Sequence, residues 1–180
     1  MKVSTLASAV MAITLAATSA VSVAADQGHG VITFKGSIID APCSISQESQ
    51  YQTVEMDQIA NVTLKNGGKS QLTPFKIQLL GCELDTLKSA SAKFTGSPAA
   101  NPDLLQLKGS AAGASLAIAD YNGDLLKLGT ESAAQTLSDG DSYLLFNAYL
   151  QGDVAAGEGT AAVVTPGNFE TFANFTLSYQ

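Results

Sequence analysis

The sequence has no arginine, no tryptophan and only one histidine among its 180 residues. Its nine basic residues are therefore all lysines, and 16 acidic residues bring the formal net charge to −7. An acidic chain without arginine lacks the basic surface with which proteins bind nucleic acid or an anionic membrane. We expect neither partner, and we interpret the negative charge as a means of staying soluble.

The single histidine, His29, leaves little room for enzymatic catalysis. A Ser-His-Asp or Cys-His site would have to use it, yet it lies in an N-terminal tail where an exposed side chain is the simpler interpretation. The glycine-rich residues 157–160 lack the lysine of a phosphate loop, and Asp120 and Asp124 flank a turn without the residue series of a calcium loop. We therefore predict no enzyme, no cofactor and no metal site.

Long apolar runs are absent beyond the N-terminus. Residues 1–25 combine Lys2, an apolar run and a small-residue site, which predicts a secretory signal peptide cleaved after Ala24 or Ala25. A membrane anchor is the alternative, but the run is shorter than the roughly 20 apolar residues that a spanning helix needs. We expect an exported mature chain of about 155 residues, the size of one domain, with no direct membrane insertion.

Cysteine is scarce as well, with Cys43 and Cys82 the only two. An even pair in an exported chain predicts a disulfide, which would stabilise the fold by about 3–4 kcal/mol because the loop is long. A metal or redox pair is the alternative, although CxxC spacing is missing and His29 is distant in sequence.

Alternation of apolar and polar residues, the period of a β-strand, dominates the rest of the chain. It predicts a hairpin around Asn122-Gly123, one helical turn at most in 85–90, and an all-β sandwich with short strands joined by glycine, proline and asparagine turns. The remaining predicted strands are 31–40, 51–59, 73–82, 91–97, 142–152 and 168–180.

The last predicted strand is apolar on one face and carries no lysine or proline after Pro166. That face holds Phe169, Ala173, Phe175, Leu177 and Tyr179. The strand could simply close its own domain, but natural edge strands are usually blunted by lysine, proline or a bulge. An unprotected apolar edge in an exported protein predicts a partner.

Several segments, in order, resemble subunits of bacterial chaperone–usher pili of the type 1 and P pilus class. They are FKGSIIDAPCSIS at 34–46, PFKIQLLGC at 74–82 and LLFNAYLQG at 144–152, followed by Gly167, fourteenth from the end, and the penultimate Tyr179. The resemblance covers the whole mature chain, and the opening is similar to that of major shaft pilins.

The resemblance implies an incomplete immunoglobulin-like sandwich that lacks its last strand and is completed by a donor strand. The count of about six main strands, where an immunoglobulin constant-type domain has about seven, agrees with it. It implies a donor-strand extension at 26–35 and a pilin domain at 36–180. It also implies a structural role for the disulfide, a periplasmic chaperone and an outer-membrane usher as partners, and export through the periplasm to a cell-surface fimbria that supports adhesion.

Two groups of residues follow from the resemblance. The donor strand would use Gly28, Gly30, Ile32 and Phe34, which share one parity. The groove, and the C-terminal strand facing chaperone and usher, would use Gly167, Phe169, Phe175, Leu177 and Tyr179. Alternatively, the N-terminal segment is an ordinary first strand of its own domain. If the segment serves in both ways, Gly36 would separate a donor portion from a first strand inside the domain.

The sequence thus predicts a polymerising shaft subunit. A minor adaptor or terminator of the same fibre is the first alternative, although a terminator would lack a good donor tail. A tip adhesin would need a second, receptor-binding domain. A free-standing ligand-binding sandwich would be complete without a donor, and a secreted enzyme is disfavoured by the residue inventory.

Overall fold

The computed structural model describes residues 29–154 and 162–180. The predicted signal peptide at 1–25 and the donor residue Gly28 lie outside these ranges. The chain divides into two compact units, 1–38 and 39–180, which are treated separately below. Within the described ranges, no helix is both long and apolar enough to cross a membrane.

In the first unit, residues 29–38 belong to no helix or strand and are exposed. Ile32 is 78% exposed and Phe34 is 89% exposed. The strand predicted at 31–40 is therefore wrong for the isolated chain. An extended segment forms a stable strand only beside a partner that completes its hydrogen-bond ladder, and alternation of side chains does not supply that partner.

The second unit is built mainly from antiparallel strands in three sheets. The largest sheet has the order β1 (Ser44–Ile45), β2 (Thr73–Cys82), β9 (Gly140–Gly152), β6 (Ala114–Asp120) and β4 (Leu105–Gln106), with β7 (Leu125–Leu126) paired to β6. A second sheet has the order β11 (Ala173–Tyr179), β3 (Ser89–Gly96) and β8 (Gln135–Thr136). β10 (Phe169–Glu170) and β5 (Lys108–Gly109) form a separate pair.

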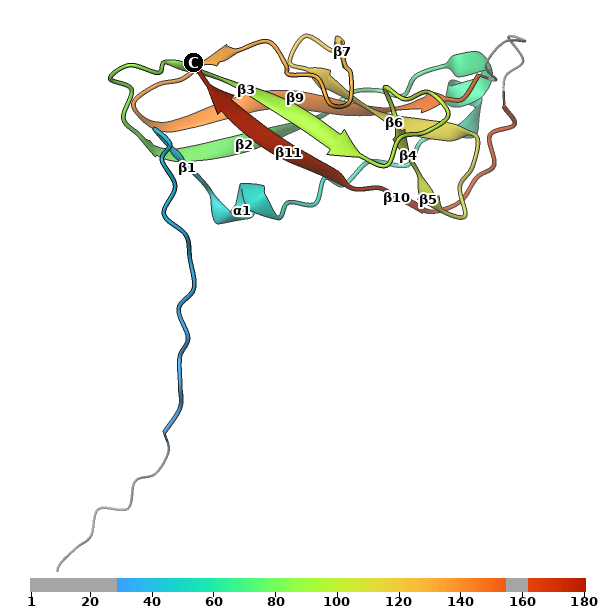
Figure 1. Cartoon of the computed structure of the whole chain (residues 1–180). Coiled ribbons are helices and arrows are strands. Elements are labelled where there is room, and N and C mark those ends of the chain that lie inside the picture. The colour runs from blue at the N-terminus through green and yellow to red at the C-terminus, as the bar shows by residue number, and fades with distance from the viewer. Residues whose placement is uncertain (1–28, 155–161) are drawn as a thin grey trace, which may run out of the picture. The chain divides into compact units, whose positions relative to one another are not determined.

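The hydrophobic core lies between the two larger sheets (Figure 1). In β2 and β9 the register pairs Phe75 with Phe146 and Ile77 with Leu144, so that one face of both strands is apolar. The ring of Phe94 in β3 meets that of Phe146 edge-on, with 5.0 Å between centroids. This packing holds the second sheet over the first and confirms the predicted sandwich.

Agreement with the sequence is best where the pattern is strong. The predicted strand 73–82 coincides with β2, and the hairpin is present, with Gly123 at a φ of 92° in its turn. The helical turn considered for 85–90 is absent, since this segment is a bend leading into β3. A helix not predicted, α1 (Gln47–Gln50), begins where Ser46 caps the Ser49 amide, and a 3-10 helix, η1, covers Asn61–Gly67.

Candidate functional site

The C-terminal strand β11 forms one edge of its sheet, because β3 is its only neighbour among the described strands. Gln180 and Ser89 exchange both main-chain hydrogen bonds, at 2.9 and 3.0 Å. Hydrogen-bonded and non-hydrogen-bonded pairs alternate along an antiparallel ladder. The main-chain groups of Phe175, Leu177 and Tyr179 therefore point away from β3, towards the open edge.

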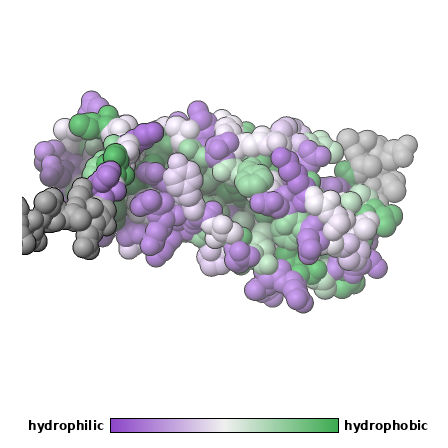
Figure 2. Space-filling view, turned by 90° about the horizontal axis from the view of Figure 1, so that it is seen from below, coloured by the Kyte–Doolittle hydropathy of each residue, from purple (hydrophilic) through white to green (hydrophobic). Residues whose placement is uncertain are grey.

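The side chains of these same three residues are half-buried and pack against the core. Phe175 lies 6.5 Å from Phe94, centroid to centroid. Beside Phe175 runs an open groove of about 1400 Å³. Its apolar lining includes Phe75, Phe94, Leu105, Leu116, Ile118, Leu150 and Phe175. On the face drawn in Figure 2, hydrophobic side chains lie exposed among hydrophilic ones.

The opposite wall of the groove is residues 51–59, for which the sequence predicted a strand. That prediction is wrong, because the segment is in no sheet. Side chains bond the adjacent edge of β2 instead: the Gln78 amide donates to Ser49 Oγ at 2.8 Å, and Gln52 Nε2 donates to the Lys76 carbonyl at 3.2 Å. The alternating pattern nevertheless reflects burial, because Val54 and Met56 are half-buried and Met56 packs against the core cluster around Leu150.

Gly167 lies at the end of the groove, where the chain passes close to another backbone segment. A Cβ at this position would lie 2.5 Å from both the Ala111 nitrogen and Ser110 Oγ. The next residue, Asn168, donates its amide to Ser110 Oγ and accepts from the Ser110 amide. The absence of a side chain thus lets the chain enter β10, where Phe169 packs in the cluster around Leu150.

Of the predicted donor residues, Gly30, Ile32 and Phe34 lie in the first compact unit. All three are exposed, and a Cβ added to Gly30 would have no atom within 4 Å. The predicted groove residues all lie in the second unit. Gly167, Phe169 and Phe175 line the groove, whereas Leu177 and Tyr179 lie further along β11, outside its lining.

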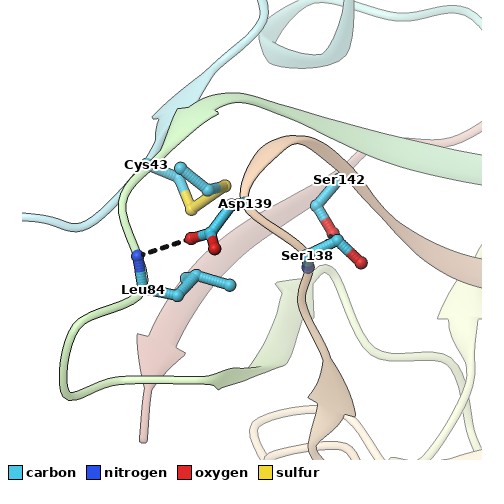
Figure 3. Close-up of a disulfide and its surroundings, with 6 residues drawn as sticks. Cys43, Leu84, Ser138, Asp139 and Ser142 are labelled. Carbon is cyan, nitrogen blue, oxygen red and sulfur yellow. Dashed lines mark hydrogen bonds between the residues drawn. A yellow bond between two sulfur atoms is a disulfide. The ribbon is translucent and has the colours of Figure 1, made fainter.

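The Cys43–Cys82 disulfide is present, as predicted, and joins the residue before β1 to the last residue of β2 (Figure 3). Both cysteines are buried. Nearby, the Leu84 amide donates to Asp139 Oδ1 at 3.0 Å, which ties the β2–β3 connection to the loop before β9. The disulfide and this hydrogen bond therefore brace the end of the sandwich at which β2 ends.

One residue that holds β11 in place was not identified from the sequence. Glu131 accepts hydrogen bonds from Ser178 Oγ at 2.8 Å and from Ser91 Oγ at 3.4 Å. These serines are partners in register on β11 and β3. A single acidic residue in a loop carries no sequence signal for such a bridge, since both partners are distant along the chain.

The geometry of the groove suits the binding of an extended chain. The described residues contain no cluster of three potential metal ligands. An extended peptide placed against β11 would gain main-chain hydrogen bonds from the open edge and bury alternate side chains in the apolar lining.

Burial raises the pKa of the Tyr179 phenol above its ordinary value of 10.0. The folded state therefore favours the protonated phenol, and its contribution to stability is complete below about pH 10 and lost as the pH rises through the folded-state value. We expect the urea midpoint of the mature chain to fall as the pH rises above about 10, and to fall less in Tyr179→Phe. Tyr121→Phe, at an exposed tyrosine, is the control, and an equal pH dependence in all three proteins would contradict the assignment.

Residues 32–180 match the sequence profile of the family described as fimbrial protein. The chain belongs to this family, as the resemblance predicted, and the family is one of structural pilins. The Fimbria A protein of Serratia marcescens is 56% identical over 163 residues, which cover 90% of this chain and 91% of the relative. The Major MR/P fimbria protein of Proteus mirabilis strain HI4320 is 45% identical over 173 residues, covering 95% of each chain.

Solved structures agree with this assignment. The crystal structure of the P pilus rod subunit PapA has a TM-score of 0.66 and 32% identity, covering 78% of this chain and 100% of that one. The structure of a chaperone–usher pilus gives a TM-score of 0.71 at 32% identity, with coverage of 86% and 97%. The fold is thus an immunoglobulin-like sandwich of the pilin type, open beside β11.

Proposed function

We propose that this protein is the structural shaft subunit of an adhesive surface fimbria. Each copy would lend residues 26–35 to the groove of the next, with Gly28, Gly30, Ile32 and Phe34 facing inwards. The single observation that carries the proposal is the open edge of β11 above an apolar groove of about 1400 Å³. A donor arm and a groove on different parts of one chain form a head-to-tail contact that does not close, so the assembly grows as a filament.

The remaining partners follow from the same groove. A periplasmic chaperone would occupy it before assembly, and an outer-membrane usher would release the subunit into the fibre at the cell surface. The proposed chemistry is non-covalent, and we infer no enzymatic activity. The major and rod subunits among the relatives favour a shaft role over an adaptor or terminator.

A peptide experiment tests the proposal. The mature chain carrying Phe34→Asp, which weakens its own arm, is melted with and without a synthetic peptide of residues 25–36. A ligand at 100 times its dissociation constant adds about 2.7 kcal/mol, which raises the midpoint by roughly 5–10 °C in a domain of this size. The same peptide with Phe34→Asp is the control and should give no shift. A high midpoint that the wild-type peptide leaves unchanged would indicate a complete, free-standing sandwich instead.

A further inference from the structure

We propose that Glu55 and Asp57, on the wall of the groove, recognise Lys35 of the incoming arm and thereby select the antiparallel orientation of the inserted strand. This proposal rests on the proposed function, because it concerns the arm of a second copy in the same groove. It adds two specificity-determining carboxylates and one lysine to a contact otherwise made by main-chain groups and apolar side chains.

The wall presents its two carboxylates on the solvent side. Val54 and Met56 are half-buried, whereas Glu55 and Asp57, which alternate with them, are exposed. Within the described part of the chain, neither carboxylate has a hydrogen-bond or ion-pair partner. An arm inserted beside this wall would place its own outward-facing side chains next to them, because side chains alternate between the faces of a sheet.

The groove lining also contains Lys108 and Glu170, which are partners in register across the β10–β5 pair. Among the described residues no ion pair joins them, and Lys108 Nζ lies 5.7 Å from the centroid of the Phe172 ring instead. On β3, the strand that pairs with β11, Lys93 lies opposite Thr176. The lining therefore holds three carboxylates, on Glu55, Asp57 and Glu170, and one lysine, which leaves the groove with excess negative charge.

The wall runs antiparallel to β11. Gln52, near its start, bonds to Lys76 in the middle of β2. Towards its end, Met56 packs in the cluster that also contains Phe169, just before β11 begins. Glu55 and Asp57 consequently lie towards the beginning of β11, and far from its end at Tyr179.

Lys35, the only lysine of the arm, lies at its C-terminal end. Residues 29–35 equal β11 in length, at seven residues. When the arm runs antiparallel to β11 with Phe34 opposite Phe175, Ile32 lies opposite Leu177, beyond the groove lining, and Lys35 lies opposite Asn174, at the end of β11 near Glu55 and Asp57. A parallel arm would carry Lys35 to the Tyr179 end, away from Glu55 and Asp57.

Lys35 also faces the correct side. It alternates with Ile32 and Phe34, so burying those two side chains in the groove turns the lysine outwards. Outward-facing neighbours of opposite charge on adjacent strands attract one another, and long-range attraction of this kind acts mainly on the rate of association.

The test measures association of fluorescently labelled peptides of residues 26–36 with the full mature chain carrying Phe34→Asp. Changing Lys35 to Glu in the peptide should slow association about tenfold at low ionic strength, and the difference should shrink below about twofold in 1 M salt. A chain with Glu55→Lys and Asp57→Lys should reverse the preference and bind the Lys35→Glu peptide faster.

The matched control is a chain with Glu83→Lys and Asp85→Lys, which changes the net charge equally at the Cys82 end of the domain. Both control residues are exposed, and neither lines the groove. The proposal predicts that this control keeps the wild-type preference. It is overturned if the control reverses the preference, as a parallel arm would require, or if the two peptides associate equally fast with every chain. No binding of the wild-type peptide would instead defeat the proposed function itself.

Discussion

Replacing Phe175 by aspartate is expected to abolish fibre assembly. Phe175 lies on the inward face of β11, against Phe94 and beside the groove. An arm inserted there would seal the new carboxylate from water without a partner, which costs on the order of 3–5 kcal/mol. The affinity of the groove should therefore fall by at least about 100-fold.

The neighbouring residue provides a matched control. Thr176 is exposed, its side chain alternates with that of Phe175, and it does not line the groove. Thr176→Asp adds the same charge to the same strand without placing it in the groove. Electron microscopy of cells that express each variant as their sole subunit should show fibres for Thr176→Asp and none for Phe175→Asp.

A corresponding change in the arm separates assembly from folding. Phe34 belongs to the first compact unit and is exposed, so Phe34→Asp should leave the melting of the 39–180 domain unchanged while fibres disappear. Thr33→Asp, on the outward face of the arm, should retain them. Normal fibres from either phenylalanine variant would refute the assignment of arm and groove.

The sequence predicts the strands that carry their own pattern. Phe75, Ile77 and Leu79 alternate with polar residues in 73–82, and the segment forms β2 because this apolar face packs in the core. Residues 51–59 alternate almost as well but form no strand. What decides between them is whether a neighbouring strand has free main-chain groups, and here Ser49 and Gln52 already occupy those of β2.

The apolar face of β11 was predictable for the same reason, since its alternation continues to Tyr179. The groove itself needs two walls, and its second wall lies more than 100 residues earlier in the chain. No local pattern connects Met56 with Phe169. The close approach at Gly167 also depends on a distant segment, so a glycine there is informative only once Ser110 is known to lie beside it.

The disulfide should contribute a large share of the stability of the subunit before assembly. Cys43 and Cys82 are 39 residues apart, and closing a loop of that length contributes about 3–4 kcal/mol in the chain-entropy model. A complete natural domain is stable by only about 5–15 kcal/mol. A sandwich that lacks one strand starts from less buried surface, so the same contribution matters more to it.

We therefore expect the Cys43→Ala/Cys82→Ala variant of the mature chain to melt roughly 10 °C lower than wild type. Alanine is chosen because serine would bury two hydroxyls at sites that are almost fully enclosed. Wild type melted in excess reductant is the control and should match the variant, since both lack the same link. The arm peptide should restore part of the lost stability, because it binds along β11 while the disulfide constrains β1 and β2. A variant that melts within about 2 °C of wild type would mean that contacts such as Asp139 with the Leu84 amide already hold this end closed.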